Sequence, residues 1–309
     1  MKNEKILGNC NKLKKGVNTM RGVIVGLTVL LVLFADGNGF CQQTNNATVS
    51  STKDLVIFES YANNAAGVQV SGTRRTVTTL TSVNDQGQRQ VTLSDQTTTL
   101  RSLGGSGLKP VSVALSSDTN ADDGSSSHTT GSTTYSYNGN GQLFDASGSA
   151  DTTGNRGRDN NGQQIGTYTA HSTDSYAIQN GEALNNRSVT TGTNNGPDGA
   201  STSTFTETKT TQYQMIHGSY HTTSTTSNNA TTGTDGSGSN ITKTYTYQRD
   251  ANGVATGMTP TQTGTQTIRD DQGGLINLTM QNYQGSAAYD PTFGYYINNE
   301  SWQWRQQSA

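Results

Sequence analysis

The sequence predicts an all-β protein built as an extended antiparallel meander, either an elongated sheet or a sandwich, with a β-solenoid as the alternative. Thr or Tyr recurs at every second position in segments such as Thr202 to Ile216 and Ile241 to Tyr247, and both residue types favour strands. Clusters of Asn, Asp and Gly separate these segments and suit tight turns, because they accept positive φ. Beyond the leader, no window has the three- and four-residue apolar spacing of an amphipathic helix.

Residues 1–41 are predicted to be a signal peptide that forms a helix after a lysine-rich, charged lead. The run from Gly22 to Ala35 contains one polar residue, Thr28. It is shorter than the roughly 20 apolar residues of a bilayer-spanning helix. We therefore expect a secreted protein, extracellular or periplasmic, with no stable membrane span after cleavage; an N-terminal anchor is the alternative. Cleavage after Cys41 would remove both cysteines, Cys10 and Cys41, so the mature chain would have no disulfide.

Composition limits both the core and the partners. Only 29% of the residues are hydrophobic, so ordinary core burial can hardly offset the entropy of ordering the chain. Disorder of the middle region is one alternative, but 13 Tyr and only four Pro favour strands. Without residues 1–41 the chain keeps 14 of 20 basic and 20 of 22 acidic residues, a net charge of −6. No basic patch predicts a nucleic-acid partner.

The N-terminal β region, residues 42–117, is the most conventional part. Leu55-Val56-Ile57-Phe58 is its longest apolar run, and we expect it to pack a small hydrophobic layer. The segment Asn84 to Gly87 predicts a hairpin connection between two alternating strands. Pro110 begins another short strand, where an edge position would tolerate its missing N–H.

Residues 118–286 form a Thr/Asn/Gly-rich region of loosely repeated strands and turns. Alternate residues of a strand share a face, so Thr202 to Thr210 and Thr261 to Thr267 are each expected to present a row of threonines. Such rows are a device of ice-binding β proteins, although Thr is also the ordinary β-forming residue of a solvent-facing side. The unevenly spaced turns favour a meander over uniform solenoid coils.

Residues 287–309 form an aromatic C-terminal segment that contains both tryptophans. Exposed rings offer large contact areas at a small entropic cost, so this segment is the candidate ligand-stacking surface, and the simpler interpretation is a strand that caps the sheet. On a strand, Trp302 and Trp304 would share one face. The candidate stacking residues are Tyr289, Tyr295, Tyr296, Trp302 and Trp304.

No catalytic constellation, cofactor motif or metal site is predicted, and we expect a protein that is not an enzyme. His217 and His221, if they lie on one strand, would be roughly 13 Å apart, too far for one metal ion. Calcium is the one cofactor considered, at Asp159 to Gly162 and at Asp270-Asp271, because these turns offer oxygen ligands. Neither has the ligand pattern of an EF-hand loop.

Two segments resemble the YD repeats of Rhs-type bacterial secreted and surface proteins. They are Gly131 to Leu143 (GSTTYSYNGNGQL) and Ile241 to Val254 (ITKTYTYQRDANGV), each with Tyr-x-Tyr before an Asn or Asp and Gly turn. Asn follows Tyr137 and Gln248-Arg249 follow Tyr247 where the repeat has Asp. The resemblance implies a secreted β-strand unit with a surface or carbohydrate-linked role.

Together these features predict a secreted or cell-surface, non-enzymatic structural or adhesive β-rich protein. Its expected partners are a cell-surface glycan or a further copy of the chain. The alternative is an extracellular carbohydrate-binding or carbohydrate-processing protein that uses the aromatic segment. An ice-binding protein and an outer-membrane barrel are lesser alternatives. The barrel is disfavoured because lipid-facing strands need alternating apolar residues, which the Thr segments lack.

Overall fold

The computed structural model describes residues 48–84, 87–103, 107–159, 161–197, 202–270, 272–289 and 296–306. The predicted signal peptide lies outside these residues. The described residues contain no helix that could span a membrane. Their strands are β1 (Thr48–Asn63), β2 (Gln69–Asn84), β3 (Arg89–Ser102), β4 (Leu108–Ala121), β5 (Ser125–Tyr137), β6 (Leu143–Arg156), β7 (Thr167–Gln179), β8 (Glu182–Asn195), β9 (Thr202–Ile216), β10 (Ser219–Gly233), β11 (Gly238–Arg249), β12 (Ala255–Arg269), β13 (Leu275–Tyr289) and β14 (Tyr296–Gln306).

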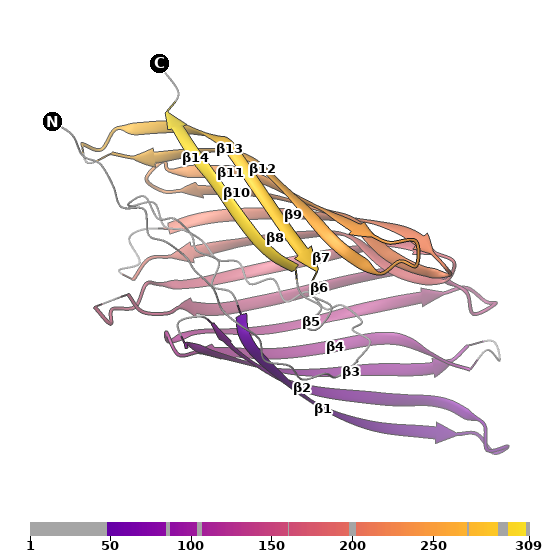
Figure 1. Ribbon diagram of the computed structural model, residues 1–309. Coiled ribbons are helices and arrows are strands. Elements are labelled where there is room, and N and C mark those ends of the chain that lie inside the picture. The colour runs from indigo at the N-terminus through magenta and orange to yellow at the C-terminus, as the bar shows by residue number, and fades with distance from the viewer. Residues whose placement is uncertain are drawn as a thin grey trace.

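These strands form one 14-stranded antiparallel sheet in which each strand pairs with the next along the chain. The predicted all-β meander is confirmed, in its single-sheet form. Figure 1 shows the sheet twisting and curving from β1 to β14, as the chirality of strands requires. The composition boundaries at residues 117 and 286 fall inside β4 and β13, so the sheet is continuous across both.

One turn motif recurs between successive strands of the sheet. At Asp250 the side-chain Oδ1 accepts hydrogen bonds from the backbone N–H groups of Asn252 and Val254, both at 2.9 Å. Gly253 completes the turn with a φ of 79°, a conformation that glycine adopts without strain. The same pair of side-chain bonds is made by the first residue of four other turns: Asn64, Asn138, Asp159 and Asp270.

Pro110 lies in an interior strand, so the expected edge position was wrong. The pairing of β3 with β4 shifts register between Thr99 and Leu100, and Leu100 pairs with Pro110. The pairing of β4 with β5 ends at Ser112 opposite Thr134, so Pro110 is paired only on its β3 side, and its missing N–H can face the unpaired side without loss of a ladder hydrogen bond. The Pro110 carbonyl accepts a 2.9 Å hydrogen bond from the Tyr137 hydroxyl.

The sheet has a thin core, and it is not where the sequence placed it. Leu55, Val56, Ile57 and Phe58 are 50 to 54% exposed on the edge strand β1, so the hydrophobic layer expected there was wrong. The buried hydrophobic side chains of the described residues come from later strands: Ala146, Leu184, Phe205, Met258 and Met280. The hydrophobic side chains that are buried from solvent therefore lie mainly in the middle and C-terminal strands.

Candidate functional site

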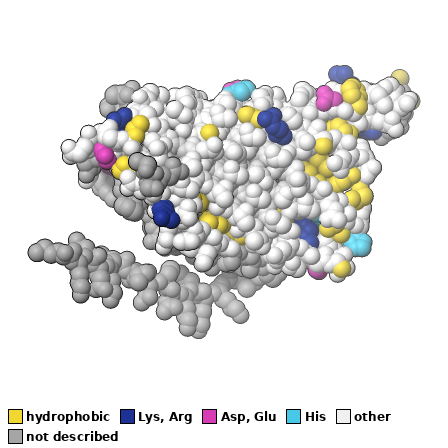
Figure 2. All heavy atoms as spheres, turned by 90° about the horizontal axis from the view of Figure 1, so that it is seen from above, with side chains coloured by type: hydrophobic (Ala, Val, Ile, Leu, Met, Phe, Trp, Pro, Cys, Tyr) yellow, Lys and Arg dark blue, Asp and Glu magenta, His cyan; other side chains and the backbone are white. Residues whose placement is uncertain are grey.

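The two faces of the sheet differ in composition. Directly paired residues of neighbouring antiparallel strands share a face, so the register defines both. The shielded face carries Phe205 and the residues in register with it, including the buried Thr190, Glu207 and Thr225. The open face is the opposite one and carries the residues that alternate with these along each strand. It includes Thr204, Thr206, Thr208 and Thr210, which confirms the predicted threonine row. Figure 2 shows a view in which charged side chains are scattered and most of the hydrophobic side chains gather toward one end.

Rows of mostly polar side chains cross the open face perpendicular to the strands. One row runs from β5 to β13 through directly paired residues: Thr130, Asp151, His171, Thr191, Thr206, Ala230, Asn240, Thr265 and Thr279. In another row of this face, the Thr226 and Thr244 hydroxyls are 3.1 Å apart. Since strands lie about 4.8 Å apart, such rows offer donors and acceptors at a regular spacing.

Two histidine–aspartate pairs lie on the open face. His128 Nδ1 is 2.7 Å from Asp118 Oδ1 between β5 and β4, and His171 Nδ1 is 2.7 Å from Asp151 Oδ1 between β7 and β6. Each pair joins directly opposed residues. Because all four side chains are at least half exposed, each pair can accept or donate hydrogen bonds to a ligand in solvent.

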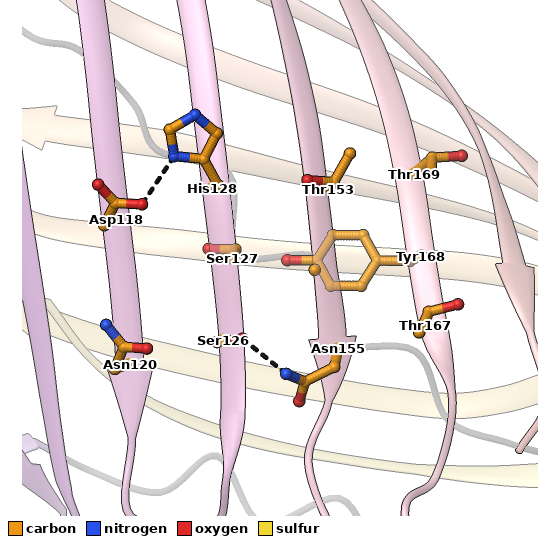
Figure 3. A pocket seen from close by; sticks show the side chains of 11 residues that line it. Asp118, Asn120, Ser126, Ser127, His128, Thr153, Asn155, Thr167, Tyr168 and Thr169 are labelled. Carbon is orange, nitrogen blue, oxygen red and sulfur yellow. Dashed lines mark hydrogen bonds and ion pairs between the residues drawn. The ribbon is translucent and has the colours of Figure 1, made fainter.

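The pair Asp118–His128 borders a shallow groove of about 460 Å³ across β4 to β7. Figure 3 shows the carboxylate and the imidazole joined on neighbouring strands, with Asn155 donating to Ser126 nearby. Hydroxyl, amide and imidazole groups line this groove, with additional hydroxyls from Thr153, Thr167 and Thr169. The groove therefore suits a hydroxyl-rich ligand.

The shielded face is held by rings that lie over glycines of the neighbouring strand. Phe205 is 3% exposed and lies over Gly192, whose added Cβ would approach the ring to 2.5 Å. Tyr61 over Gly72 and Tyr168 over Gly154 repeat the arrangement between directly paired residues. A ring that covers a glycine shields backbone that would otherwise be exposed, which lets a sheet without a second layer bury some apolar surface.

Three charged side chains lie close together in the middle of the shielded face. Glu207 is 7% exposed and accepts a 2.5 Å hydrogen bond from the Ser227 hydroxyl. Burial lowers the pKa of Lys209, against the opposing effect of the Glu207 and Asp174 carboxylates. Asp174, Glu207 and Lys209 therefore form a mixed-charge cluster, called the 174/207/209 cluster below.

Three of the tyrosines on this face, Tyr135, Tyr176 and Tyr213, have perturbed phenol groups. Burial raises the pKa of all three phenols, and proximity to Tyr176 raises the pKa of the other two further. The Tyr213 hydroxyl donates to the Asn185 carbonyl at 2.8 Å. A half-buried phenol bonded to backbone fixes its strand against the neighbouring one, because it has few alternative partners there.

The sequence offered one signal for the 174/207/209 cluster. In the segment TSTFTETKTTQYQ, Phe205, Glu207 and Lys209 alternate with threonines, which places them on the opposite face. This alternation predicted the threonine row, but the charged side chains opposite it were missed. The register that brings Asp174 to this face depends on pairings between distant residues, since Asp174 pairs with Ser188 and Ser188 with Lys209.

His217 and His221 do not lie on one strand, so that expectation was wrong. His217 has a φ of 49° in the turn between β9 and β10, and His221 lies in β10. His217 Nε2 is 2.8 Å from the Ala251 carbonyl oxygen, so this ring fixes one turn against another. Among the described residues, no three His, Cys, Asp or Glu side chains come together as metal ligands.

At both turns considered for calcium, a carboxylate oxygen holds backbone N–H groups. Asp159 Oδ1 accepts from Asn161 and Gln163 at 2.9 and 2.8 Å. Asp270 Oδ1 accepts from Gln272 and Gly274 at 3.0 and 2.6 Å. These oxygens act as turn caps, so a cation would have to compete with two hydrogen bonds at each.

Residues 296–306 of the aromatic segment form the last strand, β14, and residues 287–289 end β13. Trp302 stacks on Tyr283 with ring centroids 6.4 Å apart and an interplanar angle of 28°. Trp304 pairs with Met280 on the shielded face. Tyr289 and Tyr296 are backbone partners of β13 and β14, and Tyr295 lies outside the described residues. The two tryptophans are partly buried, and the stacking-surface assignment stays a prediction.

Comparisons with known proteins show no family. No family model matches the chain, and no curated protein matches it. Among solved structures, a porin-like protein from Bacteroides uniformis ATCC 8492 aligns with 84% of this chain and 99% of its own length. The identity is 14% and the TM-score is 0.14, values too low for any conclusion about this chain.

Proposed function

We propose that the chain is a secreted or cell-surface structural and adhesive protein without enzymatic activity, and that its open face is the contact surface. The observation that supports this most is the row from Thr130 to Thr279, which crosses nine successive strands in register. A partner with repeated hydroxyl groups, such as a cell-surface glycan, can make many weak hydrogen bonds to such rows at once. Multiple weak contacts give avidity without a deep pocket.

A binding assay on insoluble polysaccharides and a glycan array tests this proposal. The double variant Thr206→Lys/Thr265→Lys places two long charged side chains in one open-face row and should weaken binding at least tenfold. The control Asn252→Lys/Gln272→Lys adds the same charge at exposed turn positions and should bind as the wild type does. Equal loss in both variants, or no wild-type binding to any glycan, would count against the open face as the contact surface.

A carbohydrate-binding role of the aromatic segment is the second candidate, because Trp302 and Tyr283 already form a stacked pair. A sugar ring would stack against the tryptophans at the C-terminal edge of the sheet. In this case Trp302→Ala or Trp304→Ala would abolish saturable binding while the open-face lysine variant kept it. The two candidates are therefore distinguished by whether the open-face lysine variant or the tryptophan variants lose binding.

A further inference from the structure

The edge strand β1 exposes four consecutive large apolar side chains. Its residues Leu55 and Ile57 lie on the shielded face, and Val56 and Phe58 on the open face. All four are at least half exposed. Among the described residues, β2 is the only strand that pairs with β1. The outer backbone groups of an edge strand are a template for another strand, and here apolar side chains flank them on both faces.

The sequence of β1 is complementary to itself. If two copies of β1 pair antiparallel with Val56 opposite Val56, the other pairs follow from the numbering. Leu55 then faces Ile57, Asp54 faces Phe58 and Lys53 faces Glu59. Every pair joins residues of equal parity, so the shielded and open faces of both copies coincide, as a twofold axis perpendicular to the sheet requires.

We propose that the chain forms a symmetric dimer by antiparallel pairing of β1 with β1 of a second copy, centred on Val56. This pairing joins the two sheets edge to edge. It deepens the proposed function, because one assembly would then carry the open-face rows of two copies. It would give Leu55, Val56 and Ile57 apolar partners across the interface and would satisfy the outer backbone groups of the strand.

Charge supports this register. Glu59 is bonded to Arg74 of β2 at 2.6 Å, and this bond keeps the pKa of Glu59 below its usual range. Glu59 is therefore ionised at neutral pH and faces the ammonium group of the second copy's Lys53. The twofold axis makes this contact twice. Centring on Ile57 would place Leu55 opposite Glu59 and would lose both charge pairs.

The last strand, β14, fits this edge less well. Its two tryptophans, Trp302 and Trp304, lie two residues apart and so on one face, whereas the apolar residues of β1 lie on both. Pairing of β1 with β14 of another copy would also be head-to-tail and would give open polymers unless the ring closed. Such polymers, or closure within one chain, are the competing outcomes of the test.

Charge reversal tests the register in the full chain. Light scattering should give about twice 32.7 kDa for the wild type. Lys53→Glu places two carboxylates opposite each other, and Glu59→Lys places two ammonium groups opposite each other, so each variant alone should dimerise at least tenfold more weakly. An equimolar mixture should form dimers again, because the carboxylate introduced at position 53 of one variant faces the ammonium group introduced at position 59 of the other. Circular dichroism checks that each variant keeps its β structure.

A disulfide test gives a readout independent of stability. In a Cys10→Ser/Cys41→Ser background, Val56→Cys should form a dimeric disulfide on mild oxidation, since directly opposed Cα atoms lie about 4.5 to 5.5 Å apart. Phe58→Cys is the matched control on the same face. In the proposed register the two residues at position 58 would be about 13 Å apart along the strand direction, so they should not form a disulfide.

Each remaining outcome overturns the dimer. A wild-type monomer at all concentrations would do so, as would polymers of increasing mass, failure of the mixed variants to associate, or equal linkage of both cysteine variants. None of these results depends on glycan binding. Loss of the dimer with retained glycan binding would therefore leave the proposed function intact.

Discussion

At the scale of single residues, the sheet is stabilised where a ring meets a glycine. The Phe205 ring fills the space above Gly192, and a side chain at that glycine would collide with both the ring and the Thr169 carbonyl. The contact has two physical reasons. The ring can approach the neighbouring strand closely because glycine has no side chain, and the ring shields glycine backbone that would otherwise be exposed. In a sheet with so few buried apolar residues, one such pair is a large part of the core.

We expect Phe205→Ala to lower the free energy of unfolding by about 3 kcal/mol, the usual cost of removing a buried phenylalanine side chain. Phe144→Ala is the control, because Phe144 is 60% exposed and its loss should change stability by less than about 0.5 kcal/mol. Urea unfolding followed by circular dichroism measures both. Equal effects would show that the ring over Gly192 is not part of the stabilising core.

Alkaline pH should destabilise the protein through Tyr135, Tyr176 and Tyr213. Their folded-state pKa values lie above the unfolded value of about 10, so the folded chain holds these protons more tightly. Their contribution to stability is complete below that pH and is lost as the pH rises through the raised values. Tyrosinate absorbance should show a late-titrating phase that Tyr176→Phe diminishes. One phase near the unfolded value would contradict this.

At the scale of elements, the turns are determined by residues adjacent in the sequence, whereas the strand registers are determined by pairings between distant residues. The Asx-x-x-Gly turns at Asn138, Asp159, Asp250 and Asp270 were predicted as turns because four neighbouring residues determine them. Which face of each strand is shielded depends on pairings between strands. The alternation around Phe205 therefore indicated two faces of β9, but not that Asp174 of β7 lies on the face of Lys209. The exposure of Leu55 to Phe58 was missed for the same reason, because an apolar run does not reveal that its strand is at an edge.

Removing a turn cap should weaken one hairpin. Asp250→Ala deletes the acceptor of two backbone hydrogen bonds and should lower the free energy of unfolding by about 1 to 2 kcal/mol. Asp250→Asn should be nearly neutral, since Asn138 makes the same two bonds with its amide oxygen. Thermal or urea unfolding of the two variants measures the difference. If both substitutions had equal cost, the carboxylate charge rather than the cap geometry would be responsible.

At the scale of the whole molecule, each of the 14 described strands pairs only with its chain neighbours among the described residues. A sheet of this kind resembles a linear array, in which stability is a sum of nearest-neighbour terms and the ends open first. Two ladders hold each interior strand, whereas one ladder holds each end strand of a single copy. The hydroxyl pairs of the shielded face, such as Ser172 with Thr190 at 2.9 Å, add cross-strand contacts in the middle of the array.

Hydrogen exchange should therefore follow strand position. We expect the slowest amide exchange in β7 to β9, where Thr190 and Phe205 are buried, and fast exchange in β14. In the β1-paired dimer β1 becomes an interior strand, so it should exchange slowly in the wild type and rapidly in the Lys53→Glu variant, while β14 is fast in both. Mass spectrometry of peptides from each strand measures this. Uniform exchange along the chain would contradict the linear-array description, because protection would then not depend on the number of neighbouring strands.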